Sequence, residues 1–267
     1  MSTEHVLDDR RDTPRSDSPV TRAGRLANKV PEVTVYFWII KVLTTGMGET
    51  ASDWLAHLLG PVPAVALGGL GLLAALVLQF AVRRYVAWIY WTAIVAVSVF
   101  GTMAADVLHV GLGVPYAVST PAFLAALAAV FGLWYAVERT LSIHSIRTRR
   151  REAFYWAAVL ATFALGTAAG DLSATAGLGY LGSVVLFGAA ICVPALAHRG
   201  RVLGAVTAFW TAYVITRPLG ASLADWMALP TTRGGLDLGL GPVTLAWTVA
   251  ILGFVTYLAV SRADTRP

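Results

Sequence analysis

The sequence predicts an all-α integral membrane protein whose eight transmembrane helices form four parallel two-helix repeats. Three observations support this fold class. Hydrophobic residues make up 57% of the chain and charged residues only 13%, which is typical of membrane proteins. Apolar runs of about twenty residues, the length that crosses a bilayer as a helix, recur between Val33 and Val260. One motif also occurs four times along the chain.

The apolar runs divide into eight expected helices, separated by breaks that contain glycine and often proline. The expected ranges are 32–58, 62–82, 85–109, 117–139, 152–175, 180–198, 202–228 and 240–261. Residues 1–30 are polar and lack the apolar segment of a signal peptide, so we expect a disordered cytoplasmic tail there. A single transmembrane domain is expected over residues 31–262, with a basic cytoplasmic linker at 140–151 and a short cytoplasmic tail at 263–267.

The repeated motif is an aromatic residue followed by tryptophan, then a glycine ten residues after the tryptophan and an aspartate five residues further on. It reads "FWIIKVLTTGMGETASD", "YWTAIVAVSVFGTMAAD", "YWAAVLATFALGTAAGD" and "FWTAYVITRPLGASLAD" in its four copies. The repeat tryptophans are Trp38, Trp91, Trp156 and Trp210. Since one unit cannot bury a polar face alone, we expect repeats at about 31–83, 84–139, 152–199 and 201–262, with the motif helices around a common interior.

The stretch "KVPEVTVYFWIIKVLTTGMGETASDW" resembles the opening repeat of a known family of bacterial multi-pass membrane proteins. That family consists of tandem two-helix repeats of unknown function with a characteristic tryptophan in each repeat. The resemblance covers residues 29–262 and implies an architecture, but it implies no substrate.

Basic residues predict the orientation in the membrane. Those that flank one side are Arg22, Arg25, Lys29, Arg83, Arg84, Arg139, Arg147, Arg149, Arg150, Arg151, Arg199, Arg201 and Arg262. The opposite loops carry only Arg233, so both termini are expected in the cytoplasm, and the resemblance implies a bacterial plasma membrane. The net charge of +5 is then a topology signal, and the partner is the lipid bilayer rather than a nucleic acid. Nothing in the sequence indicates an oligomeric state.

The four repeat aspartates are expected to face protein or water. Fifteen residues at about 1.5 Å each place every aspartate about 22 Å beyond its tryptophan, inside a hydrocarbon core of roughly 30 Å. A charge near the centre of a membrane helix costs about 2.5–3.5 kcal/mol, which disfavours contact with lipid. These residues are Asp53, Asp106, Asp171 and Asp225.

A helical wheel places further polar residues on the same face as the aspartates. They are Lys41, Thr45, Glu49, Ser52, Thr102, Thr167 and Arg217, and Phe163 is the exception within the set. Lys41 and Glu49 occur only in the first repeat and Arg217 only in the fourth. We predict an ion pair between Glu49 and Arg217 across the first and seventh helices.

Other interpretations stay open for three of these features. The aspartates also suit helix ends near the membrane surface, as capping residues. Tryptophans at this position in a helix are more often an aromatic belt at the interface than a binding surface. His57 and His109, one turn beyond Asp53 and Asp106, suit a metal site.

An interior lined by aspartates predicts a transporter of a small cation, a divalent metal ion or a proton-coupled solute. The alternative is a membrane scaffold whose buried ion pairs only hold helices together. We expect no enzyme, because the sequence contains no HExxH motif, GxSxG motif or phosphate loop, and we expect no cofactor. Cys192 is the only cysteine, which excludes an intramolecular disulfide and a cysteine metal cluster.

Overall fold

The computed structural model describes residues 28–265, and this part of the chain contains helices and no strand. The predicted tail at residues 1–27 and the last two residues lie outside the described part. The α-helices are α1 (Val35–Leu59), α2 (Pro61–Ala81), α3 (Ala87–Asp106), α4 (Tyr116–Glu138), α5 (Arg149–Ser173), α6 (Gly179–Arg199), α7 (Ala205–Ala228) and α8 (Leu240–Ser261). Their ends lie within three residues of the expected ends.

Two π-helical turns interrupt this simple pattern. The turn η2 (Val107–Gly111) follows α3 without a break, and η4 (Ala174–Leu178) joins α5 to α6. The described chain therefore has eight α-helical segments in seven continuous helical runs, because α5, η4 and α6 form one run. Two short 3₁₀ elements, η3 (Ile143–Ser145) and η5 (Thr231–Arg233), lie in the α4–α5 and α7–α8 connections.

Five of the helical runs are long and apolar enough to cross a membrane: α2, Ala87–His109, α4, Arg149–Arg199 and α8. The helices α1 and α7 do not meet this criterion. They carry Lys41, Glu49 and Asp53 on α1 and Arg217 and Asp225 on α7. The helices α1 and α7, which carry charged residues along their length, therefore depend on their neighbours for cover.

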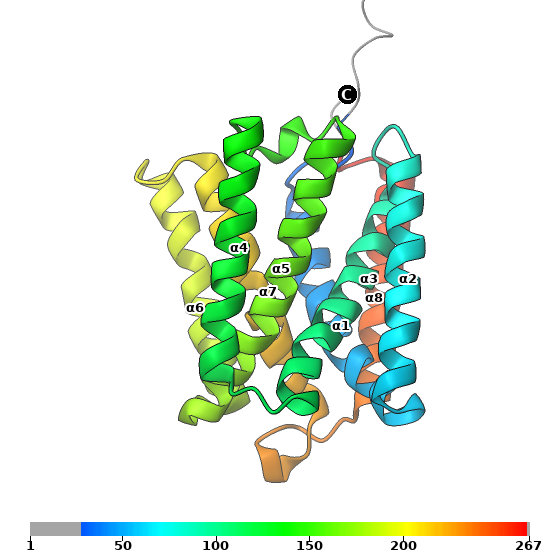
Figure 1. The fold of residues 1–267 in the computed structure, drawn as a ribbon, viewed down its shortest axis with the longest axis vertical. Helices are drawn as coiled ribbons and strands as arrows, with labels where there is room; N and C mark the ends of the chain where they lie inside the picture. The colour runs from blue at the N-terminus through cyan, green and yellow to red at the C-terminus, as the bar shows by residue number, and fades with distance from the viewer. Residues whose placement is uncertain (1–27, 266–267) are drawn as a thin grey trace, which may run out of the picture.

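The first helices of the four repeats form an inner ring, in which α1 contacts α3, α3 contacts α5, α5 contacts α7 and α7 contacts α1. Each second helix packs most extensively on the inner helix of the next repeat: α2 on α3, α4 on α5, α6 on α7 and α8 on α1. The last contact closes the ring. Figure 1 shows the α2–α3, α4–α5 and α6–α7 connections at the end of the bundle where the C-terminus lies, which makes the inner helices parallel.

The repeat glycines hold the inner helices close together. An added Cβ at each would lie 1.8–2.6 Å from a side chain on the next inner helix. The pairs are Gly48 with Ser98, Gly101 with Phe163, Gly166 with Arg217 and Gly220 with Thr45. In every pair the contacted residue stands seven positions after its own repeat tryptophan. Glycine is thus required because a helix interface this close has no room for a side chain.

An aromatic layer closes the interior at the end where the termini lie. The aromatic residue before each repeat tryptophan packs against the tryptophan of the next repeat, with ring centroids 5.7–6.1 Å apart. The pairs are Phe37 with Trp91, Tyr90 with Trp156, Tyr155 with Trp210 and Phe209 with Trp38. Hydroxyl groups of Tyr90 and Tyr155 also share a hydrogen bond.

The location of the tryptophans corrects the aromatic-belt interpretation. Trp91, Trp156 and Trp210 are at most 5% exposed, and Trp38 is half-buried. Their rings contact aromatic rings of the neighbouring inner helix, and Trp210 also packs against Phe131 and Trp134 of α4. The tryptophans therefore lie inside the bundle. Each directly follows an aromatic residue that faces the interior, and at that position its ring still points to a neighbouring inner helix.

Residues 28–34 are tied to the same end of the bundle. The buried Lys29 ammonium forms a 2.5 Å salt bridge with Glu152, whose other carboxylate oxygen accepts a hydrogen bond from Gln79. The amide of Glu32 donates to the carbonyl of Asp264 at 2.9 Å. Lys29 and Asp264 were expected in tails at 1–30 and 263–267, and both are buried. Lys29 is therefore fixed to α5 rather than disordered, and the rest of the predicted disordered tail, residues 1–27, lies outside the described part.

Candidate functional site

The aspartates of all four repeats line one cavity at the end of the bundle opposite the termini. This acidic cavity has a volume of about 510 Å³, and Asp53, Asp106, Asp171 and Asp225 lie in its wall. Glu49 and Ser52 lie in the same wall, together with apolar side chains that include Ala64, Val65, Met103 and Leu229. It reaches the surface at His57 and Arg233, which are exposed. The predicted convergence of the aspartates agrees with this geometry.

The helices continue past the aspartates, so these residues are not terminal caps in three of the repeats. Asp53 lies inside α1, Asp171 inside α5 and Asp225 inside α7. Asp106 ends α3, but the chain continues directly into η2 and its side chain makes no capping hydrogen bond. The π-helical turns follow the aspartate segments of the second and third repeats, and such turns are frequent at functional sites.

A central cluster fills the inner ring between the acidic cavity and the aromatic layer. It is formed by Lys41, Glu49, Thr102, Phe163, Thr167 and Arg217. The Arg217 Nη2 lies 2.7 Å from Glu49 Oε2, which is the ion pair that the sequence predicted. The same nitrogen donates to the hydroxyls of Thr102 and Thr167, and both hydroxyls donate to Glu49 at 3.3 Å. Four helices, one from each repeat, therefore meet at one guanidinium group.

Thr45 completes the surroundings of the guanidinium group. Its carbonyl accepts a hydrogen bond from Arg217 Nη1 at 3.3 Å. The Thr45 hydroxyl does not reach the ion pair, because it donates to the carbonyl of Val42 at 2.6 Å and to that of Thr216 at 3.4 Å. Thr45 therefore contacts the guanidinium group through its backbone carbonyl and not through its hydroxyl.

Lys41 lies on the other side of Phe163 from the acidic cavity and has an unusual environment. Its ammonium group is fully buried and has no hydrogen-bond partner among residues 28–265. It stands 4.2 Å from the ring centroid of Phe163 and 4.3 Å from that of Tyr213. The Arg217 guanidinium lies 5.1 Å from the same Phe163 ring. Lys41 is thus stabilised by the Phe163 and Tyr213 rings rather than by a carboxylate, whereas Arg217 has both the Phe163 ring and the Glu49 carboxylate.

Phe163 is a site residue that the sequence analysis treated as an exception. Tyr116, Tyr180 and Arg233 were also missed, and all three line the acidic cavity. Arg233 Nη2 donates to the Tyr180 hydroxyl at 2.9 Å. The signal for Phe163 was its position seven residues after Trp156, where the fourth repeat has Arg217. The other three residues stand in the loops or second helices, outside the repeated motif.

The cavity contains polar groups that the protein itself leaves without partners. The four aspartate carboxylates form no salt bridge with another residue in the range 28–265. Ser52 is only 1% exposed and Asp225 only 6%. Both lie in the cavity wall, and no described group makes a hydrogen bond with either side chain. Buried polar groups normally have such partners, which makes this a place suited to a bound ligand or water.

The histidine metal site is not what the structure shows. His57 Nδ1 lies 2.7 Å from the carbonyl of Asp53. The His109 ring turns away from the cavity wall, with Nδ1 2.9 Å from the Val114 carbonyl and Nε2 3.3 Å from the Ser119 hydroxyl. Within residues 28–265 no three His, Cys, Asp or Glu side chains are grouped closely enough to hold a metal ion.

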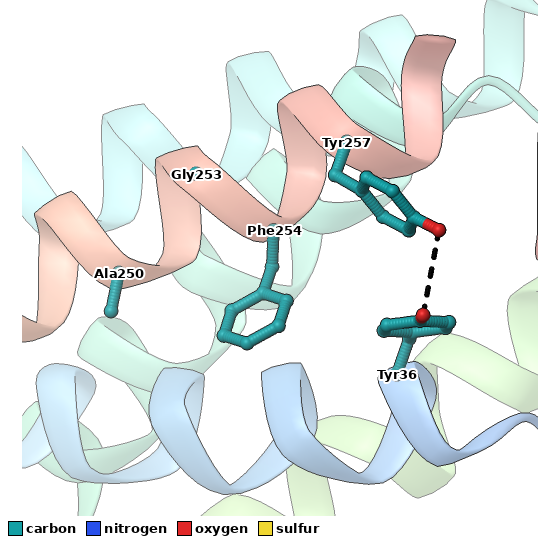
Figure 2. Close-up of a pocket in the computed structure, with 5 residues that line it drawn as sticks. All are labelled: Tyr36, Ala250, Gly253, Phe254 and Tyr257. Atoms are coloured by element: carbon teal, nitrogen blue, oxygen red, sulfur yellow. Dashed lines mark hydrogen bonds between the residues drawn. The ribbon is translucent and has the colours of Figure 1, made fainter. Parts of the chain in front are cut away.

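A second cavity, of about 390 Å³, lies between α1 and α8 and is lined by Tyr36, Ala250, Gly253, Phe254 and Tyr257. Figure 2 shows the hydroxyls of Tyr36 and Tyr257 facing each other, 3.4 Å apart. No carboxylate or basic group takes part in its wall. The acidic cavity is therefore the better candidate site.

Fold and site together define a class of protein: a closed ring of four helical repeats around a charged core, with helices that are apolar enough to cross a membrane. The model of one family, described as Repeat of Unknown Function (DUF347), matches residues 36–85, 89–140, 154–200 and 208–264. The chain belongs to this family, as its resemblance indicated. No curated protein and no solved structure matches the chain.

Proposed function

We propose that the protein is a multi-pass carrier of a small cation in a bacterial plasma membrane, with its eight helices across the bilayer. The observation that carries this proposal is the acidic cavity, to which every repeat contributes one aspartate. Ionisable residues within membrane helices are costly, and they usually mark the path of an ion or a polar solute. We also infer that the chain is not an enzyme, since its sequence contains no HExxH motif, GxSxG motif or phosphate loop.

The two closed layers support a carrier rather than an open channel. Beyond the acidic cavity the interior is filled by the central cluster and then by the aromatic layer. A cation that enters from the cavity therefore meets the Arg217–Glu49 pair, and this pair has to separate before the cation can pass. Alternation between an outward-open and an inward-open state would satisfy this requirement.

Loss of a single cavity carboxylate should reduce cation transport strongly. In proteoliposomes loaded with sodium, potassium, magnesium, manganese or proton indicators, we expect Asp106→Asn and Asp225→Asn to lower the flux of the transported cation at least about tenfold. The reason is that a hydrogen bond to a charged group contributes roughly 1.5–3 kcal/mol. Stability should stay equal or increase, because four carboxylates that share one cavity repel each other.

Asp237→Asn is the matched control, since Asp237 is exposed and lies outside the cavity wall. Its flux should equal that of the wild type. A scaffold would behave in the opposite way: the cavity variants would lose stability, and no cation would cross even in the wild type. Either of these results would reject the carrier.

The orientation can be measured by cysteine labelling in a Cys192→Ala background. Arg147 and Thr232 are exposed and belong to connections at opposite ends of the bundle. We expect Thr232→Cys in intact cells to react with an impermeant maleimide, and Arg147→Cys to react only after the cells are opened. Gly235 is a poor labelling position because an added Cβ would lie 2.0 Å from the Leu229 carbonyl. Labelling with the reverse pattern would place the termini outside the cell.

A further inference from the structure

The acidic cavity is large compared with a bare ion. Its volume of about 510 Å³ falls within the range of small-molecule pockets, roughly 300–1,000 Å³. A metal ion without its water shell would need several oxygen ligands at 2.0–2.6 Å. The described residues provide no group of three His, Cys, Asp or Glu side chains that could hold a metal ion. The carboxylates are therefore arranged for separate contacts rather than for one coordination sphere.

Charge is the second constraint on the ligand. Among the inner helices, Arg217 is already paired with Glu49, and Lys41 does not lie in the cavity wall. Four carboxylates remain in the wall without a salt bridge to another described residue. Arg233 is the only arginine or lysine in that wall, and it donates to Tyr180 at the rim. A ligand with one positive charge would pair with only one of these four carboxylates.

Apolar surface is the third constraint. Between the carboxylates the wall is formed by aliphatic side chains such as Val65, Met103 and Leu229, and the Tyr116 and Tyr180 rings also take part. Removing methylene groups from water against such surface is favourable. The Ser52 hydroxyl and the Asp225 carboxylate add buried acceptors that no described group uses. Ammonium groups are donors only, so these acceptors suit them.

We propose that the cation taken by this cavity is an aliphatic diamine or polyamine, in which two or more ammonium groups are separated by methylene chains. This inference rests on the proposed function and names its substrate class. The ammonium groups contact aspartates from different repeats, and the methylene groups lie against the aliphatic wall. Asp225 and Ser52, the most buried polar groups of the wall apart from the paired Glu49, contact the inner ammonium group.

The test compares 1,4-diaminobutane with n-butylamine, which has the same carbon chain and one charge fewer. Purified full-length protein is titrated with each compound by calorimetry, and with magnesium and manganese chloride at equal ionic strength. We expect the diamine to bind at least tenfold more tightly than butylamine and more tightly than either metal ion. Asp225→Asn should weaken diamine binding at least tenfold, whereas Asp237→Asn should not change it. Ser52→Ala should weaken it by a smaller factor and keeps the charge of the cavity intact.

Equal affinities for diamine and butylamine would overturn the proposal. So would magnesium or manganese binding that is tighter than diamine binding, although the protein would then remain a cation carrier. Transport assays in proteoliposomes separate the two levels. Flux of a metal ion or proton that diamines do not inhibit rejects the substrate class alone, while the absence of flux for every cation, diamine included, rejects the proposed function itself.

Discussion

Replacing either Glu49 or Arg217 alone should destabilise the protein by about 3–5 kcal/mol, because removal of one partner leaves a buried charge without compensation. Both side chains are at most 5% exposed, and their contact is supported by hydroxyls from two further helices. We expect Glu49→Gln and Arg217→Gln to unfold at clearly lower temperature in detergent. The double variant should be more stable than either single variant, since it contains no lone charge at this point.

Arg150→Gln provides the control for this pair. Arg150 is 67% exposed and bonds to Glu138, which also bonds to Arg151. Exposed ion pairs contribute only about 0–1 kcal/mol, so this variant should unfold near the wild-type temperature. Cation flux distinguishes two roles for the central pair. If the stable double variant still lacks cation flux, the pair is needed for transport itself. If its flux recovers fully, the pair serves only the stability of the fold. Single variants as stable as the wild type would show that the ion pair does not form.

Gly48→Ala should be the second severe change, with an expected loss of about 1–3 kcal/mol or more from overpacking. The added Cβ would lie 1.8 Å from Ser98 Oγ and 2.9 Å from the Ser98 backbone carbon. A side chain can rotate away, but the backbone of α3 can only move as part of the inner ring. Gly220→Ala should behave alike, because its Cβ would meet Thr45 Oγ1 at 1.8 Å and the Gly46 amide nitrogen at 3.1 Å.

Gly132→Ala is the matched control, since Gly132 lies inside α4 and an added Cβ there has nothing within 4 Å. Alanine favours helix by about 0.8–1 kcal/mol over glycine, so this variant should be as stable as the wild type or more so. The comparison is made from thermal unfolding and from the yield of folded protein. Equal behaviour of Gly48→Ala and Gly132→Ala would mean that the inner helices are not held at the distance described.

Much of the fold was predictable because the motif recurs with a fixed register. Repetition gave the helix ends, the four parallel units and the shared face on which Glu49 and Arg217 meet. The wheel argument depends only on helical geometry, which the repeats preserve. The residues of the acidic cavity follow for the same reason, since each aspartate stands at one position of the motif.

What the sequence did not reveal depends on contacts between distant segments. Lys29 counted as a topology signal, yet its partner Glu152 is 123 residues away. The tryptophans suit a lipid interface equally well by composition, and only their rings' contacts place them inside. Phe163 is the apolar exception on a polar helix face, and only the structure shows that its ring contacts the cationic groups of Lys41 and Arg217. Tyr180 and Arg233 lie outside the tryptophan-to-aspartate motif, so that motif did not select them.

The closure of the ring by α8 on α1 has a consequence for synthesis. Glu49 leaves the ribosome 168 residues before Arg217, and α8 emerges later still. During all that time α1 has neither its counter-charge nor α8 packed against it. Its own polarity keeps it outside the group of helices apolar enough to cross a membrane by composition. The earliest helix of the described chain is therefore the one whose contacts are completed last, when the fourth repeat arrives.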